Sequence, residues 1–256
     1  MAREVVDMKK FVLLTRPEGE NESLASKLAS SGWNVVIKPM LKIESFQSKI
    51  ELLSNLDVFD EIIFVSKNSV RQAMPLIKEH SLDRSYKKTW LAIGRGTAGE
   101  LTKYGISAKF PSDSDTESLL ELEVLKNVRS HRVLIIRGEG GRNLLEKTLV
   151  QRGAHVSLSE VYRRKALSYS DLDTLPCSSV LTSTSLDALN SLLSSLPDSR
   201  KAFNLVVPSK RIETVAKNLG FKRVTNSGGA SDKELYGAIM SFGGLSSDER
   251  KSLLKK

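Results

Sequence analysis

Three glycines with the spacing of a dinucleotide-binding motif lie in the segment AIGRGTAGEL. Gly94, Gly96 and Gly99 fit the pattern G-x-G-x-x-G, in which glycines let the backbone approach a pyrophosphate at a helix N-terminus. Asp113 and Asp115 follow at about the distance of the acid that binds the ribose in such sites. The pattern therefore raises a first hypothesis, an oxidoreductase that binds a dinucleotide.

A second set of candidate residues lies where short apolar runs end and helical patterns begin. Hydroxyls, small residues and arginines at such junctions form sites for anions, because unpaired backbone N–H groups point outward there. The same residue types are ordinary helix caps, which is the commoner role of any single Ser or Asn. The set comprises Arg16, Ser66, Asn68, Ser69, Gly94, Thr97, Arg137, Gly138, Gly140, Ser183, Ser185 and Ser209.

Other residue types that carry chemistry are sparse. The single Cys177 excludes a disulfide framework and a Cys-rich zinc site, and indicates a reducing compartment. His80, His131 and His155 do not have the spacing of ligands on one helix, so we expect no metal site. The chain also lacks the G-x-S-x-G, Walker and H-E-x-x-H motifs.

The net charge of +9 predicts a partner or substrate that carries negative charge. Nucleic acid, a polyphosphate and a polycarboxylate all qualify, as does a basic surface that only keeps the protein soluble. Dispersed Lys and Arg residues with few aromatics among them disfavour nucleic acid. The start, MAREVVDMKK, lacks the apolar region of a signal peptide, and no segment has the length of a membrane span. We therefore expect a cytoplasmic protein without a membrane partner.

The elements that must position these residues alternate between short strands and amphipathic helices. Residues 11–15 (FVLLT) predict a buried strand, followed by a helix from about residue 21 that stops at Gly32, and a second strand from Val35. The strands are apolar on both faces, which is typical of a parallel sheet covered by helices.

The chain repeats this pattern after a shift of 121 positions, which indicates two similar α/β units. The shift places Arg16 on Arg137, Gly19 on Gly140, Leu24 on Leu145, Leu28 on Leu149, Gly32 on Gly153 and Val35 on Val156. Residues 62–66 likewise resemble 180–183, and residues 90–94 resemble 204–208. A simple tandem would place the boundary near residues 126–130, whereas units that exchange strands would interleave. Both arrangements direct strand carboxyl ends and helix N-termini toward a cleft.

The repeat weakens the dinucleotide hypothesis. A dinucleotide fingerprint normally follows the first strand of its domain, whereas residues 92–94 end a later one. The following helix is short, because Gly105 comes soon after Gly99. The equivalent loop of the second copy, residues 208–211 (PSKR), has no glycine.

An ordered series of segments resembles the uroporphyrinogen-III synthase family. The segments are LLTRP (13–17), FVSKNSV (64–70), AIGRGTA (92–98), LIIRGEGGR (134–142), SEVYRRK (159–165), LTSTS (181–185) and LGF (219–221). The likeness covers roughly residues 10–242. No single motif is specific, so the order of the set carries the resemblance.

The resemblance implies an α/β fold of two similar flavodoxin-like lobes with parallel sheets, joined by a two-stranded β-ladder. Lobe one would take residues 1–38 and 168–256, and lobe two residues 46–157. The connecting strands would be residues 39–45 and 158–167.

The resemblance also implies an enzyme, a lyase of porphyrin and heme biosynthesis that needs neither a metal nor an organic cofactor. Its substrate would be hydroxymethylbilane, a linear tetrapyrrole with acetate and propionate groups. The reaction loses water and closes the ring to uroporphyrinogen III, inverting ring D through a spiro intermediate. We expect a monomer, with handover of substrate from hydroxymethylbilane synthase.

Tyr162, in SEVYRRK, matches the family's proposed acid. A tyrosine with an unperturbed pKa near 10 can donate a proton at neutral pH, although a strand tyrosine can equally be a packing residue. Ser66, Thr97 and Ser183 match positions thought to bind substrate carboxylates.

The predicted substrate-binding set has six further members. Arg16 and Arg137 would help to bind carboxylates, or would form salt bridges within the protein. Ser209 stands in a loop that departs from the family's pattern, where Lys210 or Arg211 would add charge. Asn68, Gly94 and Gly138 complete the predicted set.

A second class of function also fits two lobes that face a cleft. Such a fold would serve a non-enzymatic protein that binds an anionic metabolite without turnover. The dinucleotide oxidoreductase ranks third.

Overall fold

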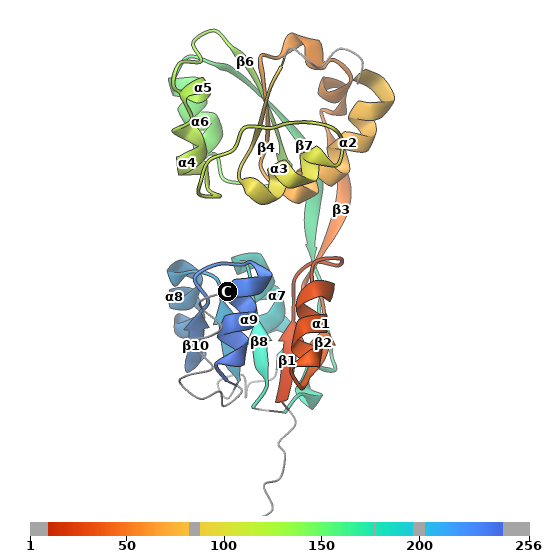
Figure 1. Cartoon of the computed structure of the whole chain (residues 1–256), viewed down its shortest axis with the longest axis vertical. Coiled ribbons are helices and arrows are strands. Elements are labelled where there is room, and N and C mark those ends of the chain that lie inside the picture. Colours follow the sequence, from red (N-terminus) through yellow and green to blue (C-terminus); the bar gives the residue numbers. More distant parts are fainter. Residues whose placement is uncertain (1–9, 82–87, 177, 197–202, 243–256) are drawn as a thin grey trace, which may run out of the picture. The chain divides into compact units, whose positions relative to one another are not determined.

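The chain forms two compact units that interleave in sequence. The computed structural model describes residues 10–81, 88–176, 178–196 and 203–242 (Figure 1). Unit 1 takes the described residues up to Lys42 and from Lys165 onward, and unit 2 takes Ile43–Arg164. The chain leaves unit 1 along strand β3 (Leu41–Ser48) and returns along β7 (His155–Ala166), and the two strands are neighbours in one sheet.

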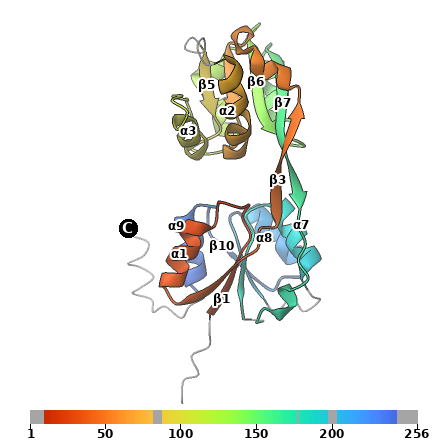
Figure 2. The ribbon, with the colours of Figure 1, turned by 90° about the vertical axis from the view of Figure 1, so that its right-hand side faces the viewer.

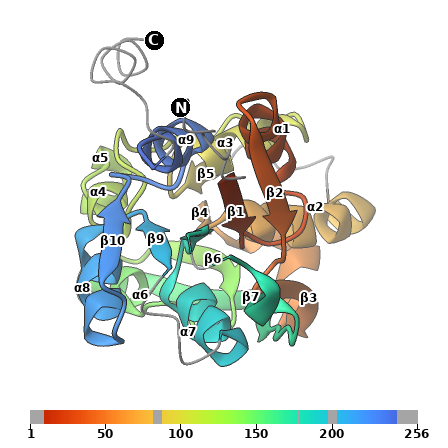
Figure 3. The same cartoon turned by 90° about the horizontal axis from the view of Figure 1, so that it is seen from below.

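Unit 1 is built on a five-stranded sheet in the order β10-β9-β8-β1-β2 (Figure 3). Its strands are β1 (Lys10–Leu14), β2 (Trp33–Ile37), β8 (Val180–Thr182), β9 (Asn204–Val207) and β10 (Arg223–Asn226). All four neighbouring pairs are parallel. The three central strands, β9, β8 and β1, are almost wholly buried, as the apolar runs in the sequence predict.

Helices cover both faces of this sheet (Figure 2). On one face α1 (Glu22–Ser30) and α9 (Asp232–Met240) pack on Val12 and Leu14. On the other face α7 (Leu186–Ser195) and α8 (Lys210–Asn218) pack on Leu13 and Leu181. The short η4 turn (Leu172–Thr174) joins the second layer through Leu172.

Unit 2 repeats the three-layer arrangement around a sheet in the order β3-β7-β6-β4-β5. Its other strands are β4 (Glu61–Phe64), β5 (Thr89–Ala92) and β6 (Arg132–Gly138). Helices α2 (Lys67–Ser81) and α3 (Arg95–Thr102) cover one face with the short turns η1 (Ile50–Ser54) and η2 (Leu56–Val58). Helices α4 (Thr116–Leu120), α5 (Glu123–Lys126) and α6 (Leu144–Gln151) cover the other.

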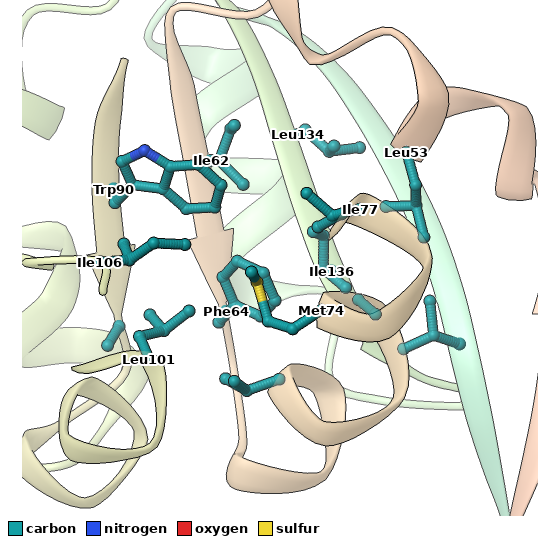
Figure 4. Packing of buried hydrophobic residues seen from close by; sticks show 14 of the residues in the cluster. Leu53, Ile62, Phe64, Met74, Ile77, Trp90, Leu101, Ile106, Leu134 and Ile136 are labelled. Atoms are coloured by element: carbon teal, nitrogen blue, oxygen red, sulfur yellow. The ribbon is translucent and has the colours of Figure 1, made fainter. Parts of the chain in front are cut away.

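The core beneath α2 and α3 is built on two aromatic rings from neighbouring strands. Phe64 and Trp90 stack with ring centroids 6.0 Å apart. Met74 packs beside Phe64, and Leu101 and Ile106 close the side toward α3 (Figure 4). This core holds β4 and β5 in register, so the loops that follow both strands lie at one edge of the sheet.

The two sheets share a strand order in which the chain first adds a strand on one side of a central strand and then continues on its other side. In unit 1 the second strand lies on one side of β1 and the third, β8, on the other. In unit 2 the strand β5 lies on one side of β4 and β6 on the other. This is the flavodoxin-like order, and its switch point lies between β1 and β8 and between β4 and β6. The predicted fold, two similar parallel α/β lobes linked by two strands, is confirmed.

The predicted helix stops are also confirmed. Gly32 after α1 and Gly153 after α6, related by the 121-residue shift, have φ of 82° and 86°. Residues with a Cβ rarely adopt this left-handed conformation, so a glycine ends each helix.

The two copies differ where the connecting strands begin. The strand β2 ends at Ile37, whereas its counterpart β7 continues over 12 residues to Ala166. The break in unit 1 falls at residues 38–40, where the N–H groups of Lys38 and Met40 still donate to the carbonyls of Leu14 and Thr15, and a separate strand, β3, begins at Leu41. The chain in unit 1 therefore bends before β3 starts, and the chain in unit 2 does not.

Candidate active site

Three of the predicted site residues meet at the switch point of unit 2. Ser66 follows β4, Gly138 ends β6, and Tyr162 lies on β7 opposite Gly138. In open α/β sheets, ligands bind outside the carboxyl ends of the strands at such a point. The strand order thus brings together residues that are far apart in sequence.

A cavity of about 180 Å³ opens at this place. Val65 and Ile135 are among its apolar wall residues, while Arg137, Arg142 and Arg164 supply positive charge. Glu146 and Tyr162 also line the cavity. Glu160 lies 3.3 Å from Arg137 and Glu117 lies 4.0 Å from Arg142. The lining itself carries three guanidinium groups and one carboxylate, which favours an anionic ligand.

Tyr162 is 1 % exposed, and both its hydroxyl and its ring contact other side chains. Its hydroxyl oxygen lies 3.1 Å from Ser66 Oγ and accepts a hydrogen bond of 2.9 Å from Arg164 Nη2. The Arg164 guanidinium also lies over the ring, 5.2 Å from its centroid. The two polar partners fix the orientation of this buried phenol, and Tyr162 is one of the residues that line the cavity.

Ser66 is fixed by reciprocal bonds with Ser69 at the start of α2. The Ser69 N–H donates to Ser66 Oγ (2.9 Å), and the Ser69 hydroxyl donates to the Ser66 carbonyl (2.7 Å). The Ser66 N–H donates in turn to Ser69 Oγ (3.2 Å). Ser66 therefore has the capping role that its residue type predicts, and its remaining capacity faces Tyr162.

Gly138 is required for the position of the Tyr162 ring. A Cβ on Gly138 would lie 2.4 Å from Tyr162 Cζ, with two further ring atoms within 2.9 Å. The carbonyl of Tyr162 also accepts a bond from the Glu139 N–H (2.8 Å), so the two backbones cannot separate freely.

We expect Gly138→Ala to destabilise unit 2 by about 1–3 kcal/mol, as overpacked cores do. Gly99→Ala is the matched control, since a Cβ there meets nothing within 4 Å and alanine is favoured in a helix by about 0.5–1 kcal/mol. Urea unfolding in the Trp33→Phe background, followed by the fluorescence of Trp90 in unit 2, measures both. Equal stability of Gly138→Ala and the wild type would show that the ring can move away at no cost.

Arg137 is buried among protein acceptors, at the wall of the cavity. Its guanidinium donates to the carbonyls of Gly141 (2.9 Å) and Arg142 (3.4 Å). Arg137 Nε lies 3.3 Å from Glu160 Oε1, but the direction of this contact is not that of a hydrogen bond. The sequence left two roles open for Arg137, binding of substrate and contacts within the protein. The structure shows contacts within the protein, and Arg137 also lines the cavity.

The other predicted residues of unit 2 lie at the same edge of the sheet without lining this cavity. Asn68 is in the first turn of α2, and Gly94 precedes α3, whose first turn contains Thr97. Thr97 is buried. A Cβ on Gly94 would lie 2.1 Å from Ser114 Oγ, so this glycine makes room for the loop before α4.

The geometry of the glycine loop gives no support to a dinucleotide site. Gly94 has an extended backbone, and the space that a Cβ would need is filled by Ser114 rather than open to a ligand. A Cβ on Gly99 would meet nothing, so the close helix packing of the fingerprint is absent. The loop also follows β5, which is an edge strand.

In unit 1, Arg16 joins the loop after β1 to the start of α9. Its guanidinium donates to Asp232 Oδ1 (2.6 Å) and to the carbonyls of Ala230 (2.6 Å) and Glu20 (3.0 Å). Burial alone would raise the pKa of Asp232, but the hydrogen bond and charge of Arg16 hold that pKa below its ordinary value. The structure therefore gives Arg16 a role in holding unit 1 together.

The predicted hydroxyls of unit 1 also have protein partners. The Ser183 hydroxyl is buried after β8, at the switch point of this sheet, and donates to the Ser185 carbonyl (3.2 Å). Ser209 caps α8 by accepting from the Ile212 N–H (3.4 Å). Beside it, Lys210 pairs with Glu213 (3.4 Å).

Sequence reasoning missed Arg164 as a member of the site. Residues two apart on a strand point to the same side of the sheet, so an arginine two positions after Tyr162 was a usable signal. The quoted segment SEVYRRK contained it.

Among the described residues, one group has the composition of a metal site. Ligand atoms of Asp60, Glu61 and His131 lie within 4.8 Å of one another at the opposite end of β4. His131 Nδ1 is 2.9 Å from Glu61 Oε1. Burial raises the pKa of Glu61, whose Oε2 has no hydrogen-bond partner in the described part of the chain. Residue spacing in the sequence could not predict this group, because Glu61 and His131 are 70 positions apart.

The protein is a two-unit α/β protein, in which β3 and β7 link two flavodoxin-like units. A buried tyrosine lines a cavity with three arginines at the switch point of unit 2. The chain belongs to the uroporphyrinogen-III synthase family, because the family described as uroporphyrinogen-III synthase HemD matches residues 22–235. It is thus an enzyme of tetrapyrrole biosynthesis. The resemblance inferred from the ordered segments is confirmed.

Curated relatives agree with this membership, and solved structures share the fold. The uroporphyrinogen-III synthases of Salmonella typhimurium and Escherichia coli K12 are each 30% identical, covering 89% of this chain and 99% of their own. The fold matches that of the Helicobacter pylori 26695 uroporphyrinogen-III synthetase (TM-score 0.67, 15% identity, 91% of this chain and 99% of that one). It also matches a mutant synthase of the extreme thermophile Thermus thermophilus (TM-score 0.60, 16% identity, 97% and 100%). No helix in the described part of this chain is long and apolar enough to cross a membrane.

Proposed function

We propose that this chain converts hydroxymethylbilane into uroporphyrinogen III, with Tyr162 as the proton donor. The observation that carries the proposal is the position of the Tyr162 hydroxyl. It is oriented by Ser66 and Arg164 in a basic cavity at the switch point of unit 2.

The charge of the cavity suits the substrate. Acetate and propionate groups surround every ring of hydroxymethylbilane, and Arg142 presents an exposed guanidinium group at the wall of the cavity. Planar guanidinium groups bind carboxylates through paired hydrogen bonds. We expect Asn68, Thr97 and Ser183, with nearby backbone N–H groups, to complete the carboxylate contacts in the two units, while the Ser66 hydroxyl contacts Tyr162.

The reaction needs one proton at its start and returns one at its end. Tyr162 donates its phenolic proton to the terminal hydroxyl of the substrate, and the C–O bond breaks as water leaves with the electron pair. The resulting azafulvenium cation is attacked by the substituted carbon of ring D, which gives the spiro intermediate. In the spiro intermediate, the bond from that carbon to the bridge carbon of ring C then breaks, which leaves a second azafulvenium on ring C. The formerly unsubstituted carbon of ring D attacks this cation and closes the inverted ring. Loss of the proton from that carbon restores the aromaticity of ring D and reprotonates the phenolate.

Positioning is the larger part of the task. In the absence of an enzyme, the unsubstituted end of ring D closes the ring and gives uroporphyrinogen I. The protein must hold the chain so that the substituted carbon reaches the cation first. The proposed lobes, residues 1–38 with 168–256 and residues 46–157, are supported by the division into units at Lys42 and Arg164.

The setting of the reaction belongs to the same proposal. A monomer in the cytoplasm would receive hydroxymethylbilane, a reactive compound, by handover from hydroxymethylbilane synthase. The net charge of +9 supports rapid capture of a polycarboxylate.

An isomer analysis tests the proposed function. Hydroxymethylbilane is generated from porphobilinogen and its deaminase, this protein is added, and the oxidised products are separated by chromatography. We expect uroporphyrin III to replace uroporphyrin I, the product of the control without this protein.

Isomer I alone, in the presence of folded protein, would contradict the assignment. Binding of hydroxymethylbilane without turnover would then favour the protein that binds an anionic metabolite. A dinucleotide that raises the melting temperature would favour the oxidoreductase instead.

A further inference from the structure

The phenolic oxygen of Tyr162 has a limited capacity for hydrogen bonds, and the structure uses much of it. A phenol has one proton to donate and two lone pairs that accept. Arginine can only donate, so the 2.9 Å contact from Arg164 Nη2 must occupy one lone pair. The bond to Ser66 Oγ, at 3.1 Å, takes either the second lone pair or the proton.

The environment of Ser66 favours the first of these arrangements. Ser66 Oγ already accepts the Ser69 N–H at 2.9 Å, and its own proton then needs an acceptor. No other acceptor for the Ser66 hydroxyl is present among the described residues, whereas the Tyr162 oxygen lies within reach. When Ser66 donates, both lone pairs of the phenolic oxygen are filled, and the phenolic proton is left for a third group.

We propose that Arg164 is a positioning residue that acts through Tyr162. By donating to the phenolic oxygen, it leaves the Tyr162 proton for the substrate hydroxyl in the cavity. After the proton has moved, the same bond stabilises the phenolate by a charge-assisted contact. This inference rests on the proposed function, since it assumes that Tyr162 protonates the leaving hydroxyl.

Direct contact with a substrate carboxylate is the alternative role of Arg164. Its side chain is exposed and lines the cavity, so a guanidinium there could bind the ligand without involving Tyr162. The two roles differ in their dependence on the Tyr162 hydroxyl. A substrate contact survives replacement of Tyr162 by phenylalanine, whereas positioning does not.

A double-mutant cycle separates the two roles. Rates of isomer III formation are measured for the wild type, Arg164→Gln, Tyr162→Phe and the double variant. We expect Arg164→Gln to lower kcat about tenfold with little change in KM, and to have no further effect in the Tyr162→Phe background. Arg164→Lys, which keeps a charged donor, should recover most of the loss.

Arg163→Gln is the matched control on the same strand. Arg163 pairs with Glu44 at 3.3 Å and lies over the Phe46 ring, away from Tyr162. We expect its kcat to equal that of the wild type. Circular dichroism and the urea midpoint show whether each variant is folded.

Each outcome decides between the roles. Provided that the wild type forms isomer III, two results would overturn the positioning role. One is that the effects of Arg164→Gln and Tyr162→Phe on kcat are additive in the double variant. The other is that Arg164→Gln raises KM and leaves kcat unchanged. A wild type that forms no isomer III overturns the proposed function and this inference with it. Failure of Arg164→Lys to recover activity, although it is folded, would also count against the positioning role.

Discussion

Tyr162→Phe is expected to lower kcat for isomer III formation about 10²-fold, the lower end of the range for loss of a general acid. The ring keeps its contact with Gly138, because phenylalanine has the same shape below the hydroxyl. Arg164 is exposed and can be solvated when its acceptor is lost, so the folded state should change little. The rate is measured from the appearance of uroporphyrin III against the background of isomer I.

Tyr236→Phe is the control for the loss of a tyrosine hydroxyl as such. Its hydroxyl lies 2.8 Å from Ser31 Oγ, in unit 1, and the variant should lose about 1 kcal/mol of stability and no activity. A Tyr162→Phe enzyme with kcat within about threefold of the wild type would exclude the phenol as proton donor. The cation would then have to form with a proton from another group or from water.

Arg16→Met is expected to lower the free energy of unfolding of unit 1 by roughly 2–4 kcal/mol. Breaking a fully buried ion pair costs about 3–5 kcal/mol, and Asp232 keeps 28% of its side-chain surface, which reduces the loss. Two backbone carbonyls also lose their donor. The sequence contains two tryptophans, Trp33 in unit 1 and Trp90 in unit 2, so urea unfolding of Arg16→Met in the Trp90→Phe background reports unit 1 alone.

The pH dependence of this loss has a defined sign. The pKa of Asp232 is lowered in the folded protein, so its pairing stabilises the fold above the ordinary carboxyl pKa. That stabilisation disappears as the pH falls through the lower, folded-state value. The difference in stability between the wild type and Arg16→Met should therefore shrink in acid.

Lys38→Met provides the matched control for loss of an ion pair. Lys38 pairs with Asp171 at 2.9 Å on the surface of the same unit, and such exposed pairs contribute little to stability because water screens them. If Arg16→Met unfolded no more easily than Lys38→Met but raised KM, Arg16 would be a substrate ligand rather than a structural clamp.

Most of the fold could be predicted because its signals are local. Buried strands such as β1 and β8 are short apolar runs, and Gly32 and Gly153 have the backbone conformation that ends a helix. The repeat then required two similar sheets. The length of β7 could not be predicted from its counterpart, because unit 1 has two separate strands, β2 and β3, where unit 2 has the single continuous β7.

The site was predicted only in part because it depends on strand order. Ser66, Gly138 and Tyr162 were each identified, but their contact follows from β6 lying between β4 and β7. Arg16 shows the opposite limit: its position at a strand end favoured an anion ligand, and its actual acceptor, Asp232, lies 216 residues away. The sequence alone does not show whether an arginine at a strand end binds a ligand or an acidic residue of the same chain.

The interleaving of the two units has a consequence for synthesis on the ribosome. Thr15 and Thr182, which are 167 residues apart, are joined by a hydrogen bond in the centre of the unit 1 sheet, whereas unit 2 is continuous from Ile43 to Arg164. Strands β1 and β2 therefore emerge first and wait, for roughly 6 to 24 s at ordinary elongation rates, while the whole of unit 2 is made. Unit 2 can fold during this interval. The edge of β1 that pairs with β8 in the finished sheet has no partner strand until β8 has been synthesised.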